Sequence, residues 1–108
     1  MIYKTMSEVM TIDIKTMRQK VRNAAALLKN MSNENRLLIL CHLSQAEMSV
    51  SQLNERFDLS QSALSQHLAL LRKEGLVQTR RESQTIFYSL DSEQAARLIE
   101  FLHREFCA

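Results

Sequence analysis

Residues 59–77 read LSQSALSQHLALLRKEGLV, and this stretch decides the fold. Apolar residues recur in it at spacings of four and three, which is the period of one helix face. Ser60 can cap the first turn with its side-chain oxygen, and Gly75 stands where a left-handed residue ends a helix. The sequence therefore predicts a helix over residues 60–74. Its core-facing residues are Leu64, Leu68 and Leu71.

The opposite face of this helix is small and polar. At about 100° per residue, it consists of Ser62, Ser65, Gln66, Ala69 and Lys73. A face that enters the major groove of DNA, roughly 12 Å wide, needs small hydrogen-bonding side chains, and Gln can bond bidentately to adenine. Ser and Gln are also common on solvated helices, so taken alone this face is better explained as ordinary surface.

The neighbouring segments complete a winged helix-turn-helix order. Ser49 and Gln52 form a capping-box pattern, which predicts a short helix to about residue 57, joined to the next by a two-residue turn. Residues 76–90 are rich in β-branched and aromatic types and are interrupted by the polar residues 82–84, which predicts a two-stranded hairpin. A short helix, a tight turn, a longer helix and a basic hairpin together favour DNA binding.

Three more helices are predicted outside this unit. One spans about residues 17–30, and the next is NENRLLILCHLS at 33–44, capped by Ser32 or Asn33. The last begins at a capping-box pattern and runs to the C-terminus. Its pattern is Asp91 with Gln94, and its apolar stripe is Ala95, Leu98, Leu102 and Phe106.

The fold class that follows is mainly α with a β-hairpin wing, in the order helix-helix-helix-helix-strand-strand-helix. We expect residues 1–15 to form an N-terminal tail or helix extension, and residues 16–108 to form a winged helix-turn-helix domain for DNA binding and dimerisation. The stripes of the first and last helices fit a dimer interface and fit an intramolecular core equally well. The first of these stripes is Met17, Val21, Ala24 and Leu28.

The candidate contacts to double-stranded DNA lie on the longer helix and on the wing. Because side chains alternate along a strand, we expect only one of Arg80 and Arg81 to reach DNA. Gln84 at the wing tip fits a minor groove and fits an ordinary turn equally well. The predicted DNA-binding residues are Ser60, Gln61, Ser62, Ser65, Gln66, Lys73, Arg80, Arg81 and Gln84.

Composition excludes several classes of protein. With one Gly and no Pro in 108 residues, the chain has too few turn residues for an all-β fold and too few glycines for a phosphate-cradling loop. It has neither a signal-peptide core nor an apolar span, so we expect a cytoplasmic protein without membrane contact. No catalytic triad, paired carboxylate or complete metal-ligand set is visible, so we expect no catalytic residue, no enzyme activity and no cofactor.

Residues 17–107 resemble the ArsR/SmtB winged-helix regulators. The resemblance is carried by ENRLLILCHL, by EMSVSQLNERFDLSQSALSQHLALLRKEGLV and by TRRESQTIFYSL, and residues 59–77 are its most specific part. It implies a homodimer built from the first and last helices, which binds an inverted-repeat operator as a transcriptional regulator. In such a dimer the two reading helices lie about one DNA turn apart.

Many members of that family sense metals, but their ligands are not intact here. The family's thiolate run is Glu-Leu-Cys-Val-Cys-Asp-Leu, and residues 47–53 read EMSVSQL, with Ser at both Cys positions. Serine hydroxyls are poor ligands for soft metals. At the family's other site Asp91 is kept, whereas Glu93 replaces the first His, and Arg104 and Cys107 fill the later positions. We therefore predict no metal site, and a metal-responsive repressor stays an alternative.

The two cysteines are candidate redox sensors. Cys41 lies on the apolar stripe of the second helix, and Cys107 is one residue from the C-terminus. A disulfide requires Cα atoms about 4.4–6.8 Å apart, which a sequence does not establish. Buried cysteine also often serves as a small hydrophobic residue. From spacing alone, thiol sensing and a purely structural role stay equally open.

The resemblance extends to one branch of the family, the HlyU-type activators and the persulfide-responsive BigR- and SqrR-type repressors. Members of this branch carry one cysteine on each of these two helices, and the pair forms a disulfide or a polysulfide bridge with oxidants or reactive sulfur species. Cys41 and Cys107 match these positions. The resemblance implies DNA affinity controlled by this pair. Alternatives are an activator that displaces a silencer without redox sensing, and a module that binds a protein instead of DNA.

Overall fold

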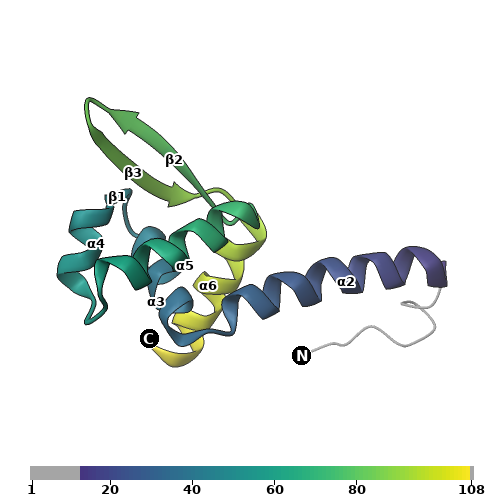
Figure 1. Ribbon diagram of the computed structural model, residues 1–108. Coiled ribbons are helices and arrows are strands. Elements are labelled where there is room, and N and C mark those ends of the chain that lie inside the picture. The colour runs from purple at the N-terminus through teal and green to yellow at the C-terminus, as the bar shows by residue number, and fades with distance from the viewer. Residues whose placement is uncertain (1–12, 108) are drawn as a thin grey trace.

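The computed structural model describes residues 13–107, and Figure 1 shows a helical body from which a hairpin and one long helix project in different directions. The predicted winged helix-turn-helix is confirmed. Most of the predicted N-terminal segment, residues 1–12, lies outside the described residues. The elements in chain order are α2 (Ile14–Met31), α3 (Glu34–Leu43), β1 (Met48–Ser49), α4 (Val50–Arg56), α5 (Gln61–Lys73), β2 (Val77–Glu82), β3 (Thr85–Leu90) and α6 (Glu93–Phe106).

The core lies where α3, α4 and α5 meet, with α6 packed beside them. The leucines predicted for the inner face of α5 are all completely buried. Burial of a Leu or Ile side chain contributes about 1.5–3 kcal/mol, so these side chains dominate the packing that fixes α5. The fully buried large side chains are Ile39 and Leu40 of α3, Leu53 of α4, and Leu64, Leu68 and Leu71 of α5.

The wing is a three-stranded antiparallel sheet in the order β1-β3-β2, where the sequence predicted a hairpin alone. The additional strand β1 has only two residues, Met48 and Ser49, which pair with Tyr88 and Phe87 of β3. Two residues are too few to show an alternating pattern, so no periodicity could reveal this strand. Its pairing attaches the wing to the segment that leads directly into α4.

The helix ends follow the expected caps in most places. The Ser49–Gln52 capping box is formed by hydrogen bonds of 2.9 and 3.2 Å, Ser60 caps α5, and Gly75 takes the left-handed φ of 76°. The capping box predicted at Asp91 is wrong. Ser92 is the N-cap of α6, because its hydroxyl accepts a hydrogen bond from the backbone N–H of Ala95 at 3.1 Å.

Helix α2 contacts the body only near its C-terminal end, where Leu27 and Met31 pack on the core. Its apolar stripe stays in solvent: Val21 is 59% exposed and Leu28 is 55% exposed. The stripe of α6 is also only partly covered, since Phe106 is 81% exposed. Both helices therefore present apolar side chains that this protomer does not bury.

Candidate functional site

The exposed face of α5 carries the polar residues that the sequence singled out. The helix is held by its buried leucines, so the opposite side of the cylinder must point away from the body. Ser60 also accepts the hydrogen bond that caps the helix, from the N–H of Ala63 at 3.1 Å. The exposed residues are Ser60, Gln61, Ser62, Ser65, Gln66, Ala69 and Lys73.

Positive charge continues along this side of the molecule. Arg72 and Lys73 occupy the last turn of α5, and Arg81 lies on β2, all with exposed side chains. None of the three forms an ion pair within residues 13–107. Gln84 lies in the two-residue wing turn, next to Ser83, whose φ is 58°. The predicted contacts therefore share one exposed region formed by α5 and the wing.

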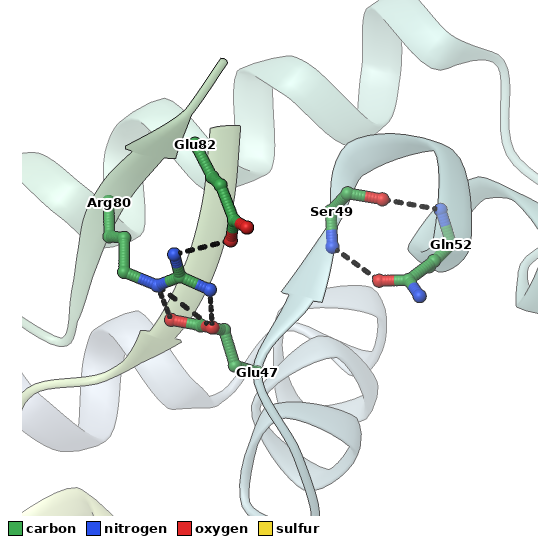
Figure 2. A network of polar contacts seen from close by, with 5 residues as sticks. All are labelled: Glu47, Ser49, Gln52, Arg80 and Glu82. Carbon is green, nitrogen blue, oxygen red and sulfur yellow. Dashed lines mark hydrogen bonds and ion pairs between the residues drawn. The ribbon is translucent and has the colours of Figure 1, made fainter. Parts of the chain in front are cut away.

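Arg80 differs from its neighbours, because carboxylates already bind it (Figure 2). Its Nε and Nη2 donate to Glu47 over distances of 2.6–3.1 Å, and its Nη1 donates to Glu82 at 2.8 Å. The hydrogen bonds to Glu47, and then those to Glu82, raise the pKa of Arg80 above its ordinary value. The hydrogen bonds from Arg80 lower the pKa of Glu47. This shift favours the ionised form of the Glu47 carboxylate.

Sequence reasoning missed both partners of Arg80. Glu82 is two residues further along β2, so strand alternation could have placed it on the same face. Glu47 lies 33 residues away in the chain and directly before β1. Only the pairing of β1 with β3 brings it beside the wing, and that strand is too short to predict.

The two cysteines line the same pocket. It has a volume of about 670 Å³ and lies between α3, which contributes Cys41, and the C-terminal half of α6, which leads to Cys107. Its walls are mostly apolar, with Leu37, Ile99 and Leu102 among them. Cys107 is exposed, whereas Cys41 is half-buried. Both thiols are free in this structure.

Burial raises the pKa of the Cys41 thiol, and the nearby charge of the Cys107 thiolate raises it further. Since the thiolate is the reacting form, this shift disfavours reaction at Cys41. Cys41 and Cys107 are 66 positions apart in the sequence, and the fold brings both to the pocket between α3 and α6.

The residues that resemble the family's thiolate run have a structural use here. Ser49 and Gln52 form the capping box of α4, and Glu47 holds Arg80 (Figure 2). Within residues 13–107, no group of three His, Cys, Asp or Glu side chains is arranged to hold a metal ion. The metal-responsive alternative therefore has no assembled donor set in this part of the chain.

These features define a winged helix-turn-helix protein. They are two helices joined by a tight turn, a polar outer face on the second helix, and an adjoining sheet with basic residues. The model of the family described as "Bacterial regulatory protein, arsR family" matches residues 33–79. The transcriptional activator HlyU of Vibrio cholerae is 52% identical over 96 residues, which are 89% of this chain and 89% of HlyU. The chain belongs to the arsR family of bacterial regulatory proteins, as its sequence predicted.

A further relative and a solved structure of HlyU agree with this assignment. The biofilm growth-associated repressor of Agrobacterium fabrum is 44% identical over 90% of this chain and 83% of its own length. The structure of reduced HlyU from Vibrio cholerae N16961 matches with a TM-score of 0.84 and 53% identity, over 88% of this chain and 100% of that one. These relatives are transcriptional regulators, so the chain is a regulator and not an enzyme. None of the described helices is both long and apolar enough to cross a bilayer.

The different exposures of the two thiols lead to a prediction about their reactivity. At neutral pH, Cys107 should react with iodoacetamide several times faster than Cys41, because Cys107 is accessible and burial keeps Cys41 protonated. Timed quenching followed by peptide mass spectrometry measures both rates in one sample. In urea the two rates should converge. Faster alkylation of Cys41 in the folded protein would contradict the pocket described above.

Proposed function

We propose that this regulator binds duplex DNA as a homodimer and that bridging of Cys41 and Cys107 through sulfur lowers its DNA affinity. The observation that carries the proposal is the pocket that both cysteines line, because one of its walls is α3, the helix whose other side supports α5. Helix α3 thus lies between the proposed site of sulfur chemistry and α5, the helix proposed to read DNA.

The DNA-binding part of the proposal is supported by the exposed surface of α5. Its Ser and Gln side chains offer donors and acceptors to base edges, and Gln66 is suited to adenine. Lys73 and Arg81 can neutralise phosphates on either side of the groove. Phosphate contacts fix the register of a protein on the duplex, whereas base contacts provide the sequence preference.

The homodimer is supported by apolar side chains that the protomer leaves exposed. Ile14, Val21 and Leu28 form a stripe along α2, with exposures of 55–60%. On α6, Phe101 is 48% exposed. A second copy of the chain offers the same two helices, and a two-fold interface requires such self-complementary surfaces. Dimerisation through α2 and α6 would also supply two copies of α5 for an inverted repeat.

The thiol chemistry begins at Cys107, the more accessible sulfur. Its thiolate attacks a peroxide or a polysulfide, and the Cys41 thiol then displaces the leaving group to close the bridge. With a peroxide the two thiols lose two hydrogens and the peroxide is reduced to water or an alcohol. With a polysulfide, Cys107 displaces a shorter polysulfide and becomes a persulfide, Cys41 then displaces hydrosulfide from it, and the bridge keeps one or more of the added sulfur atoms. One solved relative is described as reduced HlyU, so a redox state is specified for that protein.

A bridge between these sulfur atoms would fix α6 against α3. Because α3 packs on α5 through completely buried side chains, a shift of α3 must also move α5 or disturb the core. A tilted α5 loses base and phosphate contacts together. Each 1.4 kcal/mol of lost contact energy lowers affinity tenfold, so a small movement is sufficient to release DNA.

The sulfur switch is tested by DNA titration with fluorescence anisotropy. The probe is duplex DNA from upstream of the protein's own gene, and intact mass is measured on each sample. Reduced wild-type protein should bind tightly, and polysulfide treatment should weaken binding at least about tenfold. The Cys41→Ser and Cys107→Ser variants should bind as the reduced protein does and keep that affinity after treatment.

Two results would contradict the switch. One is release of DNA from both serine variants after polysulfide treatment. The other is unchanged affinity of a wild-type sample whose mass shows the bridge, which would leave a DNA-binding regulator that does not sense through Cys41 and Cys107.

Dimerisation through α2 is tested by placing a charge on its exposed stripe. Val21→Glu should shift the protein toward monomer in sedimentation velocity and weaken DNA binding at least about tenfold, because a monomer holds only one reading helix. Ala26→Glu adds the same charge at an exposed position on the other side of α2 and should leave both properties unchanged. A stable Val21→Glu dimer would exclude this helix from the interface.

A further inference from the structure

Arg80 bridges the whole width of the wing. It lies on β2 opposite Phe87 of β3, and Phe87 in turn pairs with Ser49 of β1. The guanidinium lies 4.8 Å from the centre of the Phe87 ring, a cation–π contact. It extends across that ring to Glu47, which immediately precedes β1 (Figure 2). One side chain therefore connects the outermost strand of the wing to the segment that begins α4.

Each nitrogen of the guanidinium already carries a hydrogen bond to a carboxylate, which leaves two of its five N–H groups for another partner. All three of its nitrogens donate to carboxylates, with Glu47 binding two of them and Glu82 the third. One positive and two negative charges leave this cluster with a net charge of −1, which repels a phosphate. Arg81 is the next residue on β2, so its side chain leaves the opposite face of the sheet, and it is exposed.

We propose that Arg80 is a positioning residue, which holds the wing at a fixed angle to the helix-turn-helix through Glu47, and that Arg81 is the wing residue that contacts phosphate. This inference rests on the proposed DNA binding. It also resolves the expectation that only one of the two arginines reaches DNA.

Loss of the ion pair between Arg80 and Glu47 should affect the position of the wing and not the global stability of the domain. Ion pairs between exposed side chains add little to global stability, since water screens them. No helix covers the distal end of the hairpin formed by β2 and β3 (Figure 1). The hydrogen bonds from Arg80 to Glu47 therefore restrict the movement of these two strands relative to α4. Loss of this tie should loosen the wing without unfolding the domain.

The test compares salt dependence in four single variants, Arg80→Ala, Arg81→Ala, Glu47→Gln and Glu55→Gln. DNA affinity is measured by anisotropy over a range of salt concentrations, on the upstream duplex and on a scrambled duplex. Each phosphate contact contributes about 0.9 to the slope of log affinity against log salt. Arg81→Ala should lose about this amount for each contact removed. Arg80→Ala should weaken binding with a smaller change of slope.

Glu47→Gln distinguishes the two possible roles of Arg80, because each role predicts a change of DNA affinity in the opposite direction. If Arg80 positions the wing, this variant binds roughly two- to fivefold more weakly than Glu55→Gln, which removes the same charge from an exposed site on α4. Its salt slope is no steeper than that of wild type. If Arg80 is instead a phosphate ligand restrained by Glu47, the variant binds more tightly with a steeper slope, and the proposal is wrong.

Hydrogen exchange of the wing amides tests the tie without DNA. Amides of β2 and β3 should exchange faster in Glu47→Gln and Arg80→Ala, and at the wild-type rate in Arg81→Ala, with the helical circular dichroism unchanged in all three. Unaltered exchange in Glu47→Gln would overturn the positioning role. Wild-type protein that binds neither duplex would refute the proposed DNA binding, while the exchange rates would still decide the role of Arg80.

Discussion

The structure depends on the burial of α3, which packs against α5 on one side and lines the cysteine pocket on the other. Ile39 and Leu40 are completely buried, and they share a core with Leu64 and Leu68 of α5. The same helix carries Cys41 at the wall of the pocket that Cys107 closes from α6. Close-packed interiors transmit displacement rather than absorb it. Under the proposed function, a change in the pocket therefore moves α5, although no cysteine lies on the exposed face of that helix.

The segment of residues 47–52 connects the wing to α4, which packs on this core. Ser49 begins α4 through its capping box, and its pairing with Phe87 holds β3. Glu47 extends this role by binding Arg80. In the family pattern that this segment resembles, the corresponding run carries thiolates for a metal. Here its polar side chains cap α4 and bind Arg80, and the two cysteines line a different pocket.

Local sequence patterns predicted the parts of this fold that local physics decides. Leu64, Leu68 and the cap at Ser60 follow from helical periodicity and backbone hydrogen bonding, which act within a few residues. Strand β1 and its neighbour Glu47 could not be predicted, because a two-residue strand exists only through its partner. The shared pocket of the two cysteines likewise depends on how α6 packs on α3, and that packing joins residues far apart in the chain.

In the proposed dimer, a sulfur bridge between Cys41 of α3 and Cys107 at the end of α6 changes the spacing of the two α5 helices. Pulsed electron–electron double resonance between bioorthogonal spin labels, placed at Gln66 of both protomers, measures this spacing without DNA. The distance distribution should shift when reduced wild-type protein is treated with polysulfide and should stay unchanged in Cys41→Ser. An unshifted distribution in protein whose mass shows the bridge would contradict the coupling from pocket to reading helix.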